Sequence, residues 1–457
     1  MRMRFSRDPV FYHKLVHLTA PIAFQSLMLA LVAAGDAVML GRLDQNSMSA
    51  VSLATQIQFV QNMLVSSMTA AFSVLGAQYW GKNDRSTMRI LFNMTLRLNG
   101  LVSLLFSVAC LLVPSLLMQI FTNVPELIAI GSEYLRIAGL SYFLTGISQC
   151  YLTMMKVTDH AARSAWISSG AVILNILLNA VFIFGLFGMP AMGARGAALA
   201  TLIARVVELV WALVSSFVPG YLRPDLSRFF HRFPLLSRDF RKVVLPLIGA
   251  SLLWGIGFTS YTAVMGHMGT DAAAANSVSA VVRDLMCCLC NGLSTAGGIM
   301  VGNELGSGNL EKGKLYGNRL MLLSVLCGLS ATALVLLVMP FVVRFMSMTD
   351  QARSLLRGML IITSVYMIGR CMNTIIINGI FAAGGDTAYD MYSLVVCMWG
   401  LAVPLSFLGA FVFHWSPLLV FSCTCLDEVG KIPWVLAHFR RYLCVRDLTR
   451  TSNGCVP

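Results

Sequence analysis

The chain consists largely of long apolar runs separated by short polar stretches. Twelve runs lie near residues 16–40, 48–75, 90–114, 127–155, 161–187, 194–218, 241–267, 273–301, 316–343, 352–382, 388–412 and 416–438. Each is near or above the roughly 20 residues that a helix needs to cross a bilayer. None alternates apolar and polar positions as the strands of a membrane barrel do. Because backbone groups in lipid must be paired internally, the pattern predicts an all-α membrane protein with twelve transmembrane helices.

The sequence also repeats itself at a constant offset of 225 positions. The matched pairs are Pro21 and Pro246, Gly41 and Gly266, Gly81 and Gly306, and Asn93 and Asn318. Six spans per copy give both copies the same direction in the membrane, which predicts two pseudo-symmetric six-helix bundles. We therefore expect an N-terminal lobe over residues 1–218, a cytoplasmic linker over 219–240, and a C-terminal lobe with a cytoplasmic tail over 241–457. The seam between two such lobes is where transporters hold their cargo.

Composition and charge agree with membrane insertion. Hydrophobic residues make up 57% of the chain and charged residues 12%, and the net charge is +13. The basic residues gather in every second connection, around residues 2–14, 82–89, 156–163, 223–242, 312–319 and 440–450. Arg344, Arg353 and Arg357 are a local exception on the opposite side. By the positive-inside rule, this arrangement places both termini and the linker in the cytoplasm of a multi-pass protein of the plasma (inner) membrane. The charge is therefore attributed to topology, and no nucleic-acid partner is expected.

Motifs for metal, nucleotide or catalytic chemistry are missing from the sequence. The 12 cysteines lie mostly in apolar runs without the paired spacing of a zinc site or a disulfide framework. His13 and His17 are one turn apart but have no third ligand nearby. No glycine loop for phosphate is present, and no paired-acid motif of a membrane-embedded enzyme. We expect no enzyme activity and no cofactor.

Three stretches resemble the multidrug and toxic compound extrusion (MATE) family. The first run carries Pro21-x-x-x-Gln25 and Asp36-x-x-Met39-Leu40-Gly41-Arg42, and glycine-bearing turns occur at 76–84 and 301–309. The most specific stretch runs from Asn175 and Asn179 to Gly196-Ala197-Ala198-x-Ala200-Thr201. The resemblance covers about residues 10–440. It implies a two-lobed exporter of organic cations or other amphipathic compounds, driven by entry of H⁺ or Na⁺.

The resemblance also implies an ion-coupling cluster in the first lobe. Carried over residue by residue, its members are Asp36, Asn175, Asn179 and Thr201. Many relatives have Asp where this chain has Asn179. Relatives with a second-lobe ion site carry acids on the seventh and tenth helices. This chain has none around residues 253–258 and has Arg370 on the tenth run, which argues against a second site of that kind.

Asp36 is an informative residue without any resemblance, because a carboxylate inside a membrane span usually faces a cavity and has a function. Asn175 and Asn179 are one helical turn apart and place two amides on one face. Thr201 can add a hydroxyl, so the group offers oxygens to Na⁺ or to a protonated Asp. The alternative is that Asp36 caps a helix near the outer surface and the asparagines bind neighbouring helices.

The cargo site has weaker signals. Gln25 and Met39 on the first run, and Trp254 and Tyr261 on the seventh, can reach a central cleft, although plain packing also explains them.

Several charges inside the runs have local partners. Structural ion pairs are expected for Arg205 with Glu208 and for Glu428 with Lys431, which are spaced i, i+3, and for the adjacent residues Arg283 and Asp284. Arg370 has no local partner in sequence, so it either pairs across the second lobe or contacts an anionic part of the cargo. The expected partners are a small organic substrate and membrane lipid, and the oligomeric state stays open.

Three other functions compete with an ion-coupled exporter. A flippase for lipid-linked sugars needs unpaired Arg and Lys at mid-depth, and the runs contain few beyond Arg370. A membrane-embedded enzyme needs the motifs that are missing. A passive channel differs from an exporter in one observable property, because it cannot accumulate a compound against a gradient.

Overall fold

The computed structural model describes residues 8–41, 45–218, 220–225, 227, 229–231, 233–346, 348–442 and 445–449; side chains are not described at 33–38, 40, 41 and 45. All regular elements in these ranges are helical, and no strand occurs there. Within the described residues, eleven helices are long and apolar enough to span a membrane. The prediction of an all-α fold of twelve segments is confirmed, with one segment broken into short helices.

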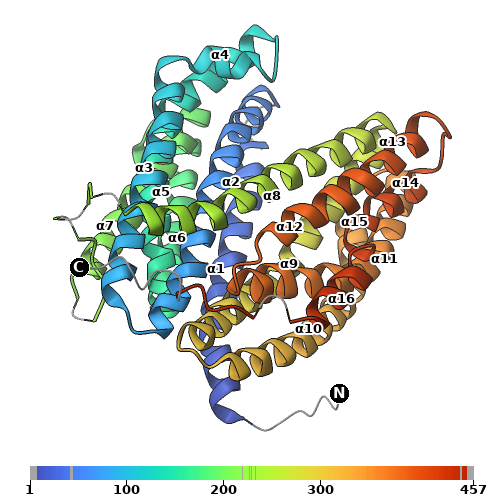
Figure 1. Ribbon diagram of the computed structural model, residues 1–457. Helices are drawn as coiled ribbons and strands as arrows, with labels where there is room; N and C mark the ends of the chain where they lie inside the picture. Colours follow the sequence, from blue (N-terminus) through green and yellow to red (C-terminus); the bar gives the residue numbers. More distant parts are fainter. Residues whose placement is uncertain are drawn as a thin grey trace. The chain divides into compact units, whose positions relative to one another are not determined.

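The first six predicted runs correspond to long, mostly uninterrupted helices. The elements are α1 (Pro9–Gly41), α2 (Gln45–Gly81), α3 (Arg85–Leu112), α4 (Pro114–Gln119), α5 (Pro125–Val157), α6 (Ala161–Phe184), the 3₁₀ turn η1 (Leu186–Gly188) and α7 (Gly193–Ser216) (Figure 1). Helix α3 begins with a side-chain cap. Asp84 accepts a hydrogen bond from the Thr87 backbone N–H at 3.0 Å and so caps α3.

The second six runs are more irregular. The elements are α8 (Pro234–His267), α9 (Thr270–Gly306), α10 (Leu310–Phe345), α11 (Asp350–Asn373) with the π-helix η3 (Thr374–Phe381), α12 (Ala388–Leu394) with the π-helix η4 (Val395–Ala402) and α13 (Val403–Phe411), then α14 (Pro417–Thr424), α15 (Leu426–Val429) and α16 (Ile432–Arg440). In the eleventh run, Pro404 has no backbone N–H to give to the preceding turn, and a π-segment ends two residues before it. The twelfth run is the series α14 to α16.

The chain divides into two compact units. The N-terminal unit comprises Phe24–Gly76 and Asp84–Ser237, and the C-terminal unit comprises Met1–Ala23, Ala77–Asn83 and Arg238–Pro457. In the N-terminal unit, α5 packs against α3 and α7, and α6 packs against α7. In the C-terminal unit, α9, α10 and α11 pack against one another and against η3.

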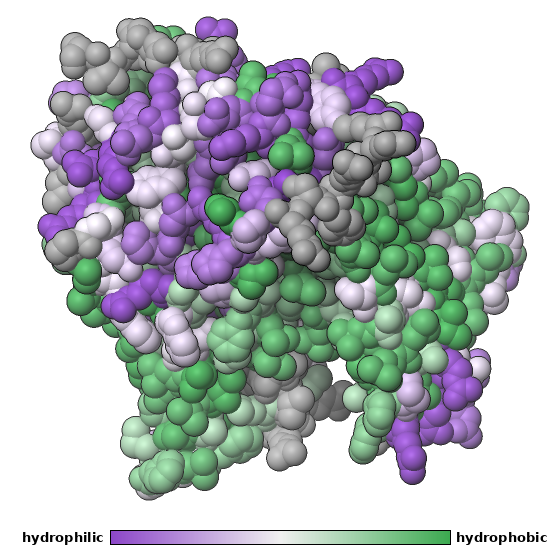
Figure 2. All heavy atoms as spheres, turned by 90° about the horizontal axis from the view of Figure 1, so that it is seen from below, coloured by the Kyte–Doolittle hydropathy of each residue, from purple (hydrophilic) through white to green (hydrophobic). Residues whose placement is uncertain are grey.

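Helix α3 shows how these bundles are suited to lipid. Leu101, Leu105 and Leu112 are more than half exposed, whereas Ser103 and Asn99 are completely buried. Inside the bundle, the Gln61 amide donates hydrogen bonds to Ser103 Oγ at 3.1 Å and to the Tyr142 carbonyl at 3.0 Å. Small and polar residues therefore join the helices while leucines face outward, as membrane bundles require. Figure 2 shows hydrophobic side chains over broad continuous areas of the surface.

The repeated motifs meet reciprocally in the C-terminal unit. Gly81, at the end of α2, lies against the backbone of Asn303 on α9, where an added Cβ would come within 2.0 Å of the Asn303 carbonyl oxygen. Gly306 lies against Gln78 in the same way, at 1.9 Å. Only glycine allows backbones to approach so closely. These two glycines therefore have an architectural role in the packing of α2 against α9.

Candidate functional site

The N-terminal unit holds a short chain of buried polar side chains on α6 and α7. The Asn179 amide donates to Asn175 Oδ1 at 3.3 Å, and the Asn175 amide donates to Thr201 Oγ1, also at 3.3 Å. Thr201 in turn donates to the Ala197 carbonyl at 3.0 Å. Both asparagines are buried. Three of the four predicted coupling residues are therefore in one hydrogen-bonded row.

The fourth predicted coupling residue, Asp36, lies within α1. The side chain of Asp36 lies outside the described residues. The coupling cluster as a whole stays a prediction.

A carboxylate elsewhere in the N-terminal unit is fully engaged. Glu208 on α7 is completely buried, lies 2.6 Å from Arg205 Nη1, and accepts a hydrogen bond from Ser148 Oγ at 2.7 Å. The Arg205 and Glu208 pair was expected from its i, i+3 spacing. A buried carboxylate with these partners has the properties of a structural link between α5 and α7.

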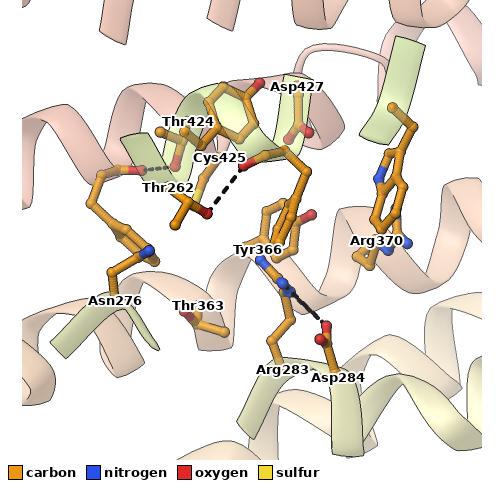
Figure 3. A pocket seen from close by; sticks show the side chains of 14 residues that line it. Thr262, Asn276, Arg283, Asp284, Thr363, Tyr366, Arg370, Thr424, Cys425 and Asp427 are labelled. Atoms are coloured by element: carbon orange, nitrogen blue, oxygen red, sulfur yellow. Dashed lines mark hydrogen bonds and ion pairs between the residues drawn. The ribbon is translucent and has the colours of Figure 1, made fainter. Parts of the chain in front are cut away.

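A pocket inside the C-terminal unit collects residues from α8, α9, α11 and the twelfth run (Figure 3). Its lining comprises Trp254, Phe258, Tyr261, Thr262, Asn276, Arg283, Asp284, Thr363, Tyr366, Arg370, Phe421, Thr424, Cys425 and Asp427. Three predicted cargo residues, Trp254, Tyr261 and Arg370, are thus brought together at one site.

One wall of this pocket is aromatic and cationic. Trp254 and Phe258, four residues apart on α8, stack with ring centroids 5.4 Å apart and an interplanar angle of 14°. The Arg283 guanidinium lies 4.6 Å from the centre of the Phe258 ring, and that of Arg370 lies 5.9 Å from the Trp254 ring. Arg283 also pairs with Asp284 at 3.1 Å, as their adjacency in sequence suggested. Flat rings with nearby charges suit an amphipathic, ring-containing compound.

Arg370 is paired across the C-terminal unit. Its Nη1 lies 2.7 Å from Glu428 Oε1. The Asn373 amide donates to Glu428 Oε2 at 2.7 Å and to the Glu428 carbonyl at 2.8 Å. Lys431 Nζ is 3.7 Å from the same carboxylate. Arg370 therefore pairs across the C-terminal unit, which is the first of its two predicted alternatives. The negative charge of Glu428 is balanced by Arg370 and Lys431.

Asp427, next to Glu428, is in a different situation. Its side chain lines the pocket and is 4% exposed. Its Oδ1 is buried without a hydrogen-bond partner, and it forms no ion pair within the part of the chain that the structure describes. Leaving a buried carboxylate oxygen unsatisfied is costly. Such an acid is a candidate to bind a cation or a proton.

Asp427 was not among the site residues predicted from the sequence. The signal that would have found it is an acid within an apolar run. Acids were sought on the seventh and tenth helices, whereas Asp427 reaches this pocket from the twelfth run.

Gln25 and Met39 lie in the N-terminal unit. Gln25 is buried, and its Oε1 has no hydrogen-bond partner among the described residues. Met39 packs against a buried apolar cluster that includes Tyr142 and Ile183. Packing in the apolar cluster accounts for Met39. The Oε1 atom of Gln25 can accept a hydrogen bond from a bound compound.

Comparisons with known proteins agree on one family. The family model MatE matches residues 21–181 and 246–408. Among curated relatives, the uncharacterized transporter YisQ of Bacillus subtilis is 24% identical over 86% of both chains. The multidrug resistance protein NorM of Burkholderia vietnamiensis is 26% identical, also over 86% of both chains.

Solved structures share the fold. The MATE transporter VcmN of Vibrio cholerae aligns with a TM-score of 0.85 and 15% identity, covering 97% of this chain and 98% of that one. A transporter of the MOP superfamily from Pyrococcus furiosus aligns with a TM-score of 0.84 and 18% identity, covering 94% and 95%. The two ranges matched by the family model begin 225 positions apart, which is the offset of the internal repeat.

Proposed function

The chain belongs to the MATE family, a family of membrane transporters, and on this basis we propose that it exports amphipathic, cationic organic compounds in exchange for H⁺ or Na⁺. It is a multi-pass membrane transporter and not an enzyme. The relatives named multidrug resistance proteins favour organic compounds as cargo. In the proposed cycle, the repeats 1–218 and 241–457, joined by the linker 219–240, alternate access to the two sides of the membrane.

The observation that carries the cationic preference is the pocket of the C-terminal unit. Stacked rings of Trp254 and Phe258 lie near Asp427, a buried carboxylate with an unsatisfied oxygen. Arg370 is balanced by Glu428, and Arg283 by Asp284. When Asp427 is ionised, it is the one charge in this lining without an ion pair among the described residues. A cation with an apolar ring system complements such a lining.

We propose that coupling takes place at Asp36 with Asn175, Asn179 and Thr201. Protonation or cation binding at Asp36 neutralises its carboxylate. Asn175, Asn179 and Thr201 on α6 and α7 offer oxygens to a bound cation and amide groups to the acid. Neither ion is favoured by these groups alone. The basic connections favour a plasma membrane location with both termini on the cytoplasmic side.

The alternative of a lipid-linked sugar flippase has less support. Its anionic cargo calls for free basic groups, whereas Arg370 and Arg283 of this pocket are both paired with acids. To bind an anionic cargo as well, Arg370 and Arg283 would have to break their salt bridges with Glu428 and Asp284.

The cationic preference is tested by binding of a fluorescent cationic dye to the purified protein in nanodiscs. Asp427→Asn should weaken binding about tenfold, because it removes one Coulombic partner from a partly desolvated pocket. Asp350→Asn is the matched control, since it removes an acid that is almost fully exposed at the start of α11. Equal affinities for the Asp427→Asn protein and the parent would contradict the assignment.

A further inference from the structure

A short segment that follows α16 is bound by one side chain of the C-terminal unit. Gln78, near the end of α2, is completely buried. Its Nε2 donates to the Arg446 carbonyl at 3.2 Å, and its Oε1 accepts from the Leu448 backbone N–H at 2.7 Å. The Gln78 carboxamide therefore forms hydrogen bonds with the backbone of residues 446 and 448, as a neighbouring peptide group would.

The same Gln78 amide reaches a second segment. Its Nε2 also donates to the Ala383 carbonyl at 2.7 Å. Ala383 lies in the turn that follows η3, at the end of the tenth run. One glutamine side chain thus joins three stretches that are far apart in sequence, namely the end of α2, the turn at 382–387 and the segment 445–449.

Side chains of the segment strengthen this attachment. Leu448 lies over Gly385, where a Cβ would come within 2.8 Å of both Leu448 methyl groups. Gly385 also has a φ of +80°, so it is glycine for two reasons. Thr449 is 1% exposed and donates to Asp447 Oδ1 through its hydroxyl at 2.7 Å and its N–H at 2.8 Å. Before the segment, the Tyr442 hydroxyl donates to Asn318 Oδ1 at 3.1 Å.

The position of Gln78 gives this attachment a mechanical meaning. Residues 77–83 belong to the C-terminal unit, and α2 continues without a break into the N-terminal unit. Contacts that hold Gln78 in place therefore restrain the end of α2, the helix through which the chain passes from one unit to the other. Three hydrogen bonds and one leucine contact are weak enough to break and re-form on the timescale of conformational changes.

We propose that residues 445–449 are a latch that holds the end of α2 against the turn at 382–387 and controls movement of that helix end. The closed latch stabilises the packing of the α2 end within the C-terminal unit. Opening it frees Gln78 and the α2 end for the rearrangement that transport requires. The latch itself is independent of the proposed function, and only its effect on transport rate rests on that function.

Hydrogen exchange measured by mass spectrometry tests the latch directly. Gln78→Glu keeps the shape of the side chain but replaces the amide NH₂ donor with a carboxylate oxygen. Leu448→Pro removes the backbone N–H that donates to Gln78 Oε1. Each should speed exchange about tenfold in peptides covering residues 77–83 and 382–387, since hydrogen bonds that close the site are lost. Leu448→Ala keeps the N–H but loses the contact with Gly385, and should give a smaller increase.

Two control variants isolate the effect. Gln351→Glu makes the same amide-to-acid change at an exposed residue at the start of α11. Arg446→Ala removes an exposed side chain of the same segment but keeps the Arg446 backbone carbonyl that Gln78 binds. Both should leave exchange at 77–83 within about twofold of the parent. Unchanged exchange in Gln78→Glu, or equal increases in all helices, would overturn the latch.

Transport of a cationic dye gives the second readout. The latch variants should alter the transport rate at least about threefold, because the closed state is less populated. Faster local exchange with an unaltered rate would overturn the control of movement. A parent protein that transports no dye would contradict the proposed function instead, and the exchange result would still decide whether the latch exists.

Discussion

Glu428 illustrates how single residues keep charge inside an apolar bundle. Arg370, Asn373 and Lys431 surround its carboxylate, and it is 2% exposed. Removing one partner of such a group leaves a buried charge without compensation. The arrangement is therefore far more sensitive to single changes than to paired ones.

This sensitivity gives a prediction for stability. Glu428→Gln should lower the free energy of unfolding by about 3–5 kcal/mol, because Arg370 keeps its charge with no acid beside it. Thermal denaturation in detergent measures the loss. The double variant Glu428→Gln with Arg370→Gln should recover much of it, and a double variant no more stable than the single one would refute the pairing argument.

Residue-level features were predictable where partners are close in sequence. The i, i+3 spacing of Arg205 with Glu208, and of Glu428 with Lys431, indicated ion pairs that the structure contains. The Arg370 partner was left open, because 58 positions separate it from Glu428 and only tertiary packing joins them. Asp427 was missed as a pocket acid for the same reason.

At the scale of elements, the apolar runs predicted the helices well because lipid leaves the backbone no other way to pair. Their irregularities followed less directly. The π-segments η3 and η4 and the division of the twelfth run into α14, α15 and α16 depend on how the helices pack, which one sequence does not encode locally. The glycine turns were identified, but their reciprocal packing was not.

That packing can be tested by adding one methyl group. Gly81→Ala or Gly306→Ala should destabilise the protein by about 1–3 kcal/mol, because each Cβ would collide with a backbone carbonyl. Gly266→Ala is the matched control, since no atom lies within 4 Å of the Cβ it would add. Melting temperatures compare the three variants. A loss in Gly266→Ala as large as in Gly81→Ala would show that packing is not the cause.

The start of α1 provides a pH-dependent contact with α10. Arg319 donates to Asp8 Oδ2 at 2.9 Å, and this hydrogen bond lowers the pKa of Asp8 below its ordinary value. A lowered pKa in the folded state means that the contact stabilises above the pKa of the unfolded chain, about 3.9. The stabilisation is lost as pH falls through the folded value.

The Asp8→Asn variant checks this dependence. It should melt below the parent at pH 7, and the two melting temperatures should converge as the pH falls below about 4. Glu311→Gln, which removes the exposed acid that pairs with Lys314, is the matched acid-to-amide control with little expected change. A difference between Asp8→Asn and the parent that grows toward low pH would contradict the assigned direction.

At the scale of the whole molecule, the internal duplication is the strongest information in the sequence. Two copies of one helical pattern, 225 positions apart, coincide with two matches to one family model. Fold and family could therefore be predicted without coordinates. The choice of ion and cargo could not, because both depend on a few side chains such as Asp36 and Asp427 rather than on the repeated framework.

Ion-driven export is tested most directly by following a fluorescent cationic dye in proteoliposomes under separately imposed H⁺ and Na⁺ gradients. One of the two ion gradients should drive accumulation of the dye against the concentration gradient of the dye. An ionophore should abolish this accumulation, and Asp36→Asn should lose it while Asp350→Asn keeps it. Dye movement that only equalises concentrations, does not respond to either ion gradient and is unchanged in Asp36→Asn would contradict ion-driven export.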